Sequence, residues 1–206
     1  MRLLLARHGE TDWNAAGHIQ GQTDTSLNTN GIAQAVQLAQ RLRETGVQVN
    51  KLYSSPQKRA METAQIVART LECGIVSVEA LREMSFGAWE GYSWAEIEMR
   101  WPRDYAAYLA DRLNVPPPGG ESFAQLLDRV VPALEEIAAA EAGVVLAVSH
   151  SAVIKAVMCR LDGVPFREIH LRYHLGNAQW AVLETDEDGR LMSALGQSDG
   201  MDRRLK

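Results

Sequence analysis

Residues 3–11 read LLLARHGET, and this stretch decides the fold. Its first four residues are apolar, which is typical of a short strand that is buried on both faces of a parallel sheet. Arg7, His8 and Gly9 follow that strand directly. An arginine presents a planar set of N–H donors, and a glycine leaves room for a ligand to approach the backbone. The stretch therefore predicts a buried strand that ends at an anion-binding position.

Two later stretches repeat this arrangement of an apolar run followed by polar residues. Residues 49–53 run into Ser54-Ser55-Pro56, and residues 144–148 run into Ser149-His150-Ser151. Each of the three runs precedes a helix-like stretch, and these stretches are residues 31–43, 56–71 and 151–161. Strands that alternate with helices predict an α/β fold of three layers, with a mostly parallel central sheet between helices. Ligands of such sheets bind beyond the carboxyl ends of the strands, where these polar residues lie.

The middle of the chain has a different character. Residues 83–118 contain three of the five tryptophans and no clear strand. Ser122 and Gln125 form a capping-box pattern at the start of a helix that runs to about residue 142, and Pro132 inside it predicts a kink or two helices. We therefore expect residues 1–206 to form a single domain in which residues 84–121 are a small helical cap over the sheet edge.

Composition excludes several classes of protein. The 206 residues include 21 Lys and Arg and 26 Asp and Glu, which gives a net charge of −5 and disfavours non-specific binding to nucleic acid or anionic membranes. No apolar run approaches the length of a membrane span, and the N-terminal run is too short for a signal peptide. Two cysteines are too few for a disulfide scaffold. We expect a cytoplasmic protein without nucleic-acid or membrane partners, and a homodimer remains an open alternative.

The candidate catalytic residues come from four separate stretches. His8 is a nitrogen nucleophile when it is neutral, and Arg7 beside it can bind phosphoryl oxygens. Arg59 lies in the first turn of a predicted helix, where its charge opposes the helix dipole unless an anion is held there. Glu83 lies among apolar residues, which raise a carboxyl pKa and suit a general acid. His150 lies at a helix N-terminus, which favours an anion.

Taken singly, each of these residues also has an ordinary structural interpretation, as a packed histidine or a paired charge. Their order along the chain distinguishes them. The stretches concerned are residues 7–11 with Asn14, residues 19–21, residues 54–64, residues 81–91 and residues 149–151. Together they resemble the motifs of the histidine phosphatase superfamily, also called the phosphoglycerate mutase-like family. The resemblance extends over about residues 2–195.

The resemblance implies a mechanism without a metal ion or other cofactor. His8 would attack the phosphorus of a monoester and form a phosphohistidine. Glu83 would protonate the leaving oxygen and then deprotonate the attacking water. Arg7, Arg59 and His150 would stabilise the phosphoryl charge, which elsewhere is the task of Mg²⁺. The positions that match substrate-binding residues of the family are Asn14, Gln20, Gly21 and Ser151.

Weaker signals depart from the family pattern or lie outside it. His18 occupies a position where many relatives have an arginine. His170 and His174 have the spacing of a zinc-binding pair but no evident third ligand, so we expect no metal site. The tryptophans of the cap either line a substrate pocket or pack against one another, and packing is the more common outcome.

The resemblance also bears on the reaction. Residues 117–122, PPGGES, and the short segment between Glu83 and His150 are similar to the α-ribazole phosphatases and broad-specificity phosphatases of the family. We therefore expect a phosphomonoester hydrolase acting on a small phosphorylated metabolite. α-Ribazole 5′-phosphate is one candidate substrate, together with sugar phosphates, phosphoglycerate and phosphoserine. The alternatives are a cofactor-dependent phosphoglycerate mutase and a phosphoester-binding relative with little turnover.

Overall fold

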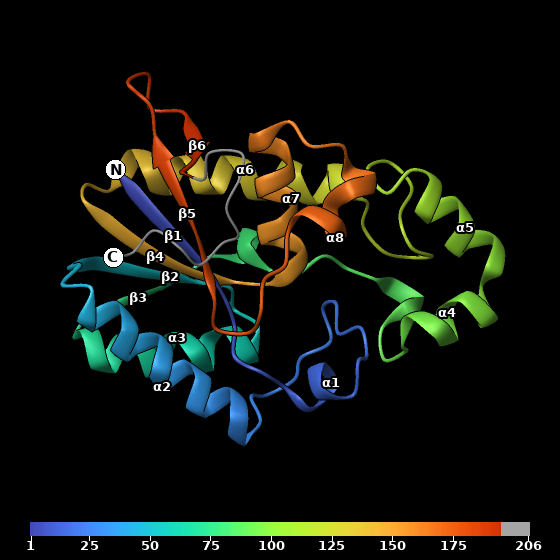
Figure 1. The fold of residues 1–206 in the computed structure, drawn as a ribbon, viewed down its shortest axis with the longest axis horizontal. Coiled ribbons are helices and arrows are strands. Elements are labelled where there is room, and N and C mark those ends of the chain that lie inside the picture. The colour runs from blue at the N-terminus through green and yellow to red at the C-terminus, as the bar shows by residue number, and fades with distance from the viewer. Residues whose placement is uncertain (195–206) are drawn as a thin grey trace.

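The fold is a six-stranded sheet between two layers of helices, in a computed structural model that describes residues 1–194 (Figure 1). The strand order is β3-β2-β4-β1-β5-β6. The strands are β1 (Arg2–Arg7), β2 (Val49–Ser54), β3 (Ile75–Ser77), β4 (Val144–Ser149), β5 (Trp180–Thr185) and β6 (Leu191–Ser193). β1 to β4 pair in parallel, whereas β5 and β6 add an antiparallel edge beside β1. The predicted three-layer α/β fold is confirmed, and the antiparallel edge was not predicted.

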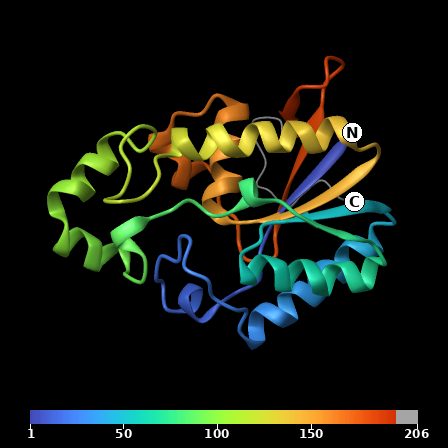
Figure 2. The same ribbon diagram turned by 180° about the vertical axis from the view of Figure 1, so that it is seen from behind.

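Each face of the sheet is covered by a pair of long helices (Figures 1 and 2). One layer contains α2 (Thr29–Glu44) and α3 (Lys58–Leu71), and the other contains α6 (Phe123–Ala140) and α7 (Ser151–Asp162), followed by the short α8 (Ile169–Arg172). Leu3 and Leu5 of β1 belong to the core on the α6 and α7 side, and Leu4 and Ala6 belong to the core on the α2 and α3 side. Because strand side chains alternate between faces, a strand buried on both sides must be apolar throughout.

Strand register brings the polar ends of the central strands together. Arg7 of β1 lies opposite Ser149 of β4, and Ser54 of β2 lies opposite Val148. The next residues after these strands therefore project from the same edge of the sheet. This alignment places two stretches that are about 140 residues apart in the sequence side by side.

Several helices differ from the sequence-based prediction. α3 begins at Lys58 with Gln57 as its N-cap, two residues after Pro56. α6 is one helix that contains Pro132, starts at the predicted capping box of Ser122 and Gln125, and ends at Ala140. A four-residue helix, α1 (Asp12–Ala15), was not predicted; it is too short to show a hydrophobic period.

Residues 84–121 contain no strand, as expected, and form α4 (Trp94–Arg100) and α5 (Pro102–Ala110), which lie at one end of the molecule (Figure 1). Their aromatic side chains pack on one another. The ring of Trp89 meets that of Tyr108 edge-on with centroids 5.2 Å apart, and Trp94 stacks on Tyr108 at 6.1 Å. These aromatic side chains are continuous with the core on the α6 and α7 side of the sheet.

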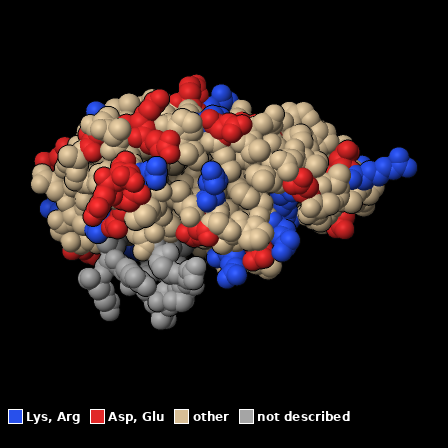
Figure 3. Space-filling view, turned by 90° about the horizontal axis from the view of Figure 1, so that it is seen from above, with Lys and Arg blue, Asp and Glu red and all other residues tan. Residues whose placement is uncertain are grey.

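The surface carries charges of both signs. Figure 3 shows Lys and Arg as well as Asp and Glu side chains on the face seen from above, with wide areas of other residues between them.

Within residues 1–194, no helix combines the length and the apolar character that crossing a membrane requires. Cys73 and Cys159 are both free thiols.

The loop before α4 depends on a glycine. Gly87 has a φ of +52°, and a Cβ there would lie 2.3 Å from the carbonyl oxygen of Pro118. Gly119, with a φ of +72°, has open space at the same position. We predict that Gly119→Ala lowers the free energy of unfolding by about 1–2 kcal/mol, the usual strain of an L residue in this region. Gly87→Ala should cost more because the backbones must also separate.

Urea denaturation of the two variants tests this prediction, with Gly119→Ala as the matched control for backbone strain. Equal losses of unfolding free energy in the two variants would contradict the close approach of the Gly87 and Pro118 backbones.

Candidate active site

A cavity of about 310 Å³ opens beyond the carboxyl ends of β1 and β4. That volume is at the small end of the range for ligand sites, roughly 300–1,000 Å³. Eight of the nine predicted site residues line the cavity, namely Arg7, His8, Asn14, Gln20, Gly21, Arg59, Glu83 and Ser151. The ninth, His150, is not among the lining residues, and its ring centroid lies 5.2 Å from that of His8.

His8 is held in one orientation by the strand ends. Its backbone N–H donates to the carbonyl of Ser149, and its Nδ1 lies 2.6 Å from the carbonyl oxygen of Gly9. A carbonyl only accepts hydrogen bonds, so Nδ1 carries the proton and Nε2 keeps its lone pair. Burial and the charges of Arg59 and Arg7 hold the pKa of His8 well below 6.5. His8 is therefore a neutral imidazole whose Nε2 can act as a nucleophile.

The role expected for Gly9 is corrected by the structure. A Cβ on Gly9 would lie 2.4 Å from the carbonyl oxygen of Gly31, at the start of α2. The absent side chain thus makes room for the backbone of α2. The backbone N–H of Gly9 donates to Thr63 of α3. Gly9 therefore fixes the helices behind the strand end, and this fixes the carbonyl that orients His8.

Arg59 places a fully buried guanidinium beside this nucleophile. Its Nη1 donates to the carbonyl of Thr23 at 2.9 Å and its Nη2 to the carbonyl of Gly21 at 2.7 Å. Its Nε lies 3.3 Å from Nε2 of His8 and donates to that lone pair. Burial lowers the pKa of Arg59 to about 10, so it still carries its charge at neutral pH.

Arg7 supplies the second cation. Its Nη1 donates to the carbonyl of Leu175 at 2.7 Å, and its Nε is buried without a hydrogen-bond partner among the described residues. A buried donor of this kind loses its hydration without compensation, at a cost of about 1–3 kcal/mol. An anion in the cavity would remove that cost.

Glu83 adds a buried carboxyl to the cavity. Burial raises its pKa above the ordinary 4.5, although the charges of Arg59 and Arg7 and two backbone N–H groups act in the opposite direction. Those N–H groups belong to Met84, 3.0 Å from Oε1, and to Ala152 in the first turn of α7, 3.4 Å from Oε2. A carboxyl group with a raised pKa can donate a proton, and the carboxylate it leaves can accept one.

Two residues that the sequence did not single out hold the backbone of Glu83. Oε1 of Gln57 accepts a hydrogen bond from the Glu83 N–H at 2.6 Å. Arg129 of α6 donates to the carbonyls of Ala80, Arg82 and Glu83, and forms a two-pronged ion pair with Glu121. A glutamate and an arginine eight residues apart in sequence give no local signal of pairing.

His150 is the N-cap residue of α7 and is fully buried. Its Nε2 lies 2.8 Å from the hydroxyl of Ser55, and its Nδ1 has no hydrogen-bond partner within residues 1–194. Burial and the charges of Arg59 and His8 hold its pKa well below 6.5. The site therefore contains a second neutral imidazole with one unused nitrogen.

Asn14 and Gln20 present amide groups to the cavity. Oδ1 of Asn14 accepts hydrogen bonds from Thr11 and Asn177, and Oε1 of Gln20 accepts from Thr11 and Thr25. Within the described part of the chain, the amide nitrogens of Asn14 and Gln20 have no partner. Both residues line the cavity, so these N–H donors remain available to a ligand.

The other two predicted binding residues, Gly21 and Ser151, have different roles from the two amides. The carbonyl of Gly21 accepts from Arg59 and Gln57, so this residue anchors the arginine. Ser151 lines the cavity as the first residue of α7.

The weaker signals also have a place in the structure. His18 and His170 line the cavity, and so do Trp94 and Phe86 of the predicted cap. Among residues 1–194, no group of three or more His, Cys, Asp and Glu side chains is arranged to hold a metal ion. Both outcomes expected for the cap tryptophans apply to Trp94, because it packs on Tyr108 and also lines the cavity.

Comparison with known proteins gives a consistent result. A family model described as histidine phosphatase superfamily (branch 1) matches residues 3–198. A metal-independent phosphoserine phosphatase of Arabidopsis thaliana is 42% identical over 162 residues, which are 77% of this chain and 68% of that protein.

Two solved structures share the fold closely. A mycobacterial glucosyl-3-phosphoglycerate phosphatase superimposes with a TM-score of 0.83 at 30% identity, covering 96% of this chain and 99% of the other. A structure from Escherichia coli described as a candidate α-ribazole-5′-phosphate phosphatase has a TM-score of 0.82 at 27% identity, with 98% of each chain covered. The comparisons agree with the resemblance seen in the sequence.

The tautomer of His8 can be measured directly. We predict that ¹⁵N–¹H correlation spectra show His8 as the neutral Nδ1–H form, with a pKa well below 6.5 because burial and two arginines disfavour its charged form. Arg59→Met should raise that pKa toward 6.5, and a His8→Ala spectrum assigns the signal. An Nε2–H pattern for His8 would contradict the orientation described here.

Proposed function

This chain belongs to the histidine phosphatase superfamily and is a phosphoric monoester hydrolase, and from that premise we propose that it hydrolyses a small phosphomonoester through a phosphohistidine on His8, without a metal ion. One observation carries the proposal. Nε2 of His8 keeps a lone pair inside a cavity that also holds Arg7, Arg59 and the carboxyl of Glu83. These are the groups required to attack phosphorus, stabilise its oxygens and protonate the leaving group.

In the first step, Nε2 of His8 attacks phosphorus and the bond from phosphorus to the ester oxygen breaks. The proton of the Glu83 carboxyl moves to that oxygen, which leaves as an alcohol. Arg59 has a separate task in this step. Its Nε–H now donates to the lone pair of Nε2, and it becomes available to a phosphoryl oxygen once that lone pair bonds to phosphorus.

In the second step, the Glu83 carboxylate takes a proton from water, and the water oxygen attacks the phosphorus of the phosphohistidine. The bond from Nε2 to phosphorus breaks, inorganic phosphate leaves, and His8 regains its lone pair. Arg7, Arg59 and His150 hold the phosphoryl oxygens in both steps. The unused buried Nδ1 of His150 and the unpaired Nε of Arg7 support this role.

The substrate in this proposal is a small metabolite. The cavity is about 310 Å³, and Phe86, Trp94 and Tyr108 from residues 84–121 line it, so we propose that this segment acts as the cap of a single domain. The named relatives point to phosphoserine, glucosyl-3-phosphoglycerate and α-ribazole 5′-phosphate as the first candidates. We also propose a cytoplasmic location, in keeping with the two free thiols.

Phosphate release from a panel of monoesters in EDTA tests the proposal. The panel contains these three esters, both phosphoglycerates and 4-nitrophenyl phosphate. We predict release by the wild type, ³²P labelling of His8, and loss of both in His8→Ala. His174→Ala, which removes an exposed histidine, is the matched control and should keep both.

Two outcomes would contradict the hydrolase proposal. Binding of phosphate esters without labelling of His8 would remove the covalent step. Exchange between 2- and 3-phosphoglycerate that is faster than phosphate release would indicate a mutase.

The pH dependence follows from the two shifted pKa values. His8 must be neutral and its pKa is lowered, so activity is lost only when the pH falls through a value well below 6.5. Glu83 must be protonated and its pKa is raised, so kcat/KM falls as the pH rises through a value above 4.5. We predict a bell-shaped profile of kcat/KM with an acidic optimum. A profile that is flat across the alkaline side would remove Glu83 from the role of acid.

The two tasks of Glu83 can be separated by the leaving group. Glu83→Gln should slow hydrolysis of alkyl phosphates by roughly 10²–10⁴-fold, the usual contribution of a general acid or base. With 4-nitrophenyl phosphate, whose phenolate leaves without a proton, the variant should release one equivalent of nitrophenolate rapidly and then turn over slowly. Equal slowing of the burst for both substrates would contradict the proton-donor role.

A further inference from the structure

Glu90 lies in the segment before α4, and its carboxylate fastens the loop between α1 and α2, which lies beside that segment (Figure 1). Its Oε1 accepts from the backbone N–H of Gln22 at 2.9 Å and from that of Phe86 at 3.1 Å. Its Oε2 accepts from the backbone N–H of Thr23 at 2.9 Å and from the Thr23 hydroxyl at 2.6 Å. A carboxylate has about four acceptor positions. This one junction therefore uses all of them.

The peptide groups that Glu90 binds are the ones that hold Arg59. The carbonyl of Gly21, which accepts from Nη2 of Arg59 at 2.7 Å, belongs to the same peptide unit as the N–H of Gln22. The C=O and N–H of a trans peptide point in opposite directions, so the carboxylate and the guanidinium lie on opposite sides of one planar amide. Thr23 forms a second link, because its N–H and hydroxyl bind Glu90 and its carbonyl accepts from Nη1 of Arg59 at 2.9 Å.

This arrangement gives Arg59 a counterion that does not touch it. Among residues 1–194, no carboxylate forms a hydrogen bond or ion pair with Arg59. Burial lowers the pKa of Arg59, whereas the charges of Glu83, Asp24 and Glu90 raise it. Glu83 is protonated before the reaction in the proposed mechanism, and Asp24 is exposed, so water screens its charge. Glu90 reaches the guanidinium through a chain of hydrogen bonds, and such chains polarise one another.

The indirect contact leaves Arg59 open to phosphate. A carboxylate in direct contact with the guanidinium would occupy the N–H donors that phosphoryl oxygens need. Here the two Nη atoms are held by carbonyls, and Nε lies 3.3 Å from Nε2 of His8. Glu90 is not among the described residues that line the cavity. It therefore acts on the site only through other residues.

The close approach of the carboxylate to this peptide requires a glycine. Gly21 has a φ of +52°, and a Cβ there would lie 2.1 Å from Oε1 of Glu90. A side chain at this position would push the carboxylate away from the N–H of Gln22. The same glycine that anchors Arg59 through its carbonyl thus makes room for Glu90.

We propose that Glu90 is the positioning residue of Arg59, which it holds in place and balances in charge through the Gly21–Gln22 peptide and Thr23. The assignment rests on the proposed function, in which Arg59 stabilises the phosphoryl group. Loss of the Glu90 carboxylate weakens that stabilisation, and the effect disappears when the guanidinium is absent.

A double-mutant cycle tests whether Glu90 acts through Arg59. The four proteins are the wild type, Glu90→Gln, Arg59→Met and the double variant, and kcat/KM is measured with 4-nitrophenyl phosphate. Glutamine keeps the shape of glutamate, but its amide nitrogen would face N–H and O–H donors. We expect Glu90→Gln to lower kcat/KM by about 10–100-fold, the usual effect of removing a group that orients an active-site ligand. In the Arg59→Met background it should change kcat/KM by less than about 2-fold.

Glu62→Gln is the matched control. Glu62 also accepts a backbone N–H of this loop, that of Leu27 at 2.8 Å, but no carbonyl of that peptide binds Arg59 in the described chain. This variant should keep the wild-type kcat/KM within about 2-fold. Equal losses from Glu90→Gln in both backgrounds, or an equal loss in Glu62→Gln, would overturn the proposal.

The Nε–H signal of Arg59 in NMR spectra gives a second test that requires no turnover. Its hydrogen bond to His8 should protect this proton from exchange with water, and the absence of the signal in Arg59→Met assigns it. We expect Glu90→Gln to shift the signal and to speed its exchange by about 10-fold, which corresponds to the loss of one charge-assisted hydrogen bond. Glu62→Gln should leave it in place. An unchanged signal in Glu90→Gln overturns the proposal even where Arg59→Met has no activity.

Failure of the positioning role is distinguishable from failure of the proposed function. A wild type that releases phosphate while the two substitutions act independently keeps the function and loses the positioning role. A wild type that releases no phosphate, with an Arg59 signal that depends on Glu90, keeps the positioning role and loses the function. Should Glu90→Gln not fold, Thr23→Val takes its place, since it removes one of the four donors to the carboxylate and should have the same effect to a smaller degree.

Discussion

The site depends on a guanidinium that is buried without a carboxylate partner in the described chain. Arg59 is fully buried, and two of its nitrogens are held by backbone carbonyls of the loop after α1. Removing such a charge from water costs several kcal/mol, and carbonyl dipoles recover part of that cost. Placing it in the first turn of α3 adds the unfavourable field of the helix dipole. A bound phosphate would offset both costs, so the buried guanidinium favours an anion in this cavity.

The same buried charge sets the two ionisation states on which chemistry depends. Burial alone disfavours both charged forms, the imidazolium of His8 and the carboxylate of Glu83. The arginines then act on the two groups in opposite ways, because they repel the imidazolium further and attract the carboxylate. His8 is therefore pushed firmly to its neutral form, whereas in Glu83 the two effects oppose each other and burial, the larger one, raises its pKa. A raised carboxyl pKa suits a group that must give up a proton in one step and take one back in the next.

The sequence predicted the central strands and the groups at their ends because those features are local. A run such as residues 3–6 is apolar because the strand is buried on both faces, and this can be seen from those few residues alone. The polar residues follow the run directly. β5 was missed because it pairs with β1 at the other end of the chain, and β6 is a strand of three residues that pairs with β5. The clamp of Arg129 and Glu121 on the backbone of Glu83 was missed because a loop and a helix meet only in three dimensions.

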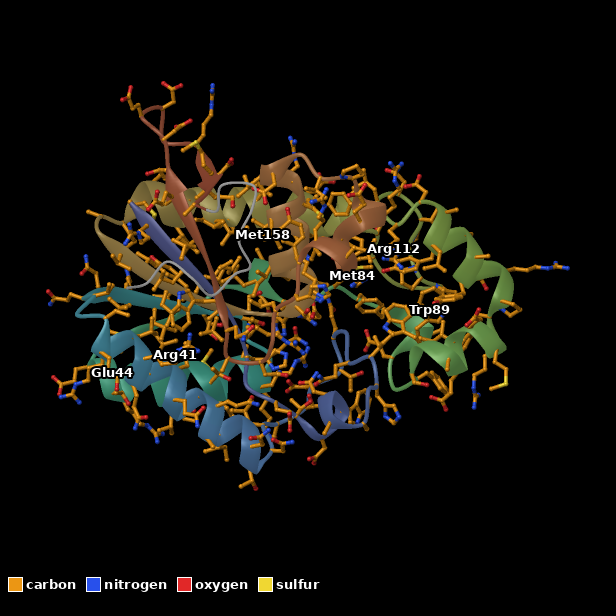
Figure 4. The ribbon with its side chains drawn as sticks, viewed as in Figure 1. Arg41, Glu44, Met84, Trp89, Arg112 and Met158 are labelled. Carbon is orange, nitrogen blue, oxygen red and sulfur yellow. The ribbon has the colours of Figure 1, made fainter. Side chains whose placement is uncertain are left out.

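The inner end of the cavity, around His8, and its outer end are formed by different elements of the fold. The phosphate end is made from strand termini and the first turns of α3 and α7, whose positions follow from the register of the sheet. The outer end also takes side chains from α5, α8 and the second turn of α7 (Figures 1 and 4). Proteins named for different phosphate esters share this fold with TM-scores of 0.82 and 0.83. Such a division allows the outer wall to change its side chains, and hence the substrate, while the charges around His8 stay in place.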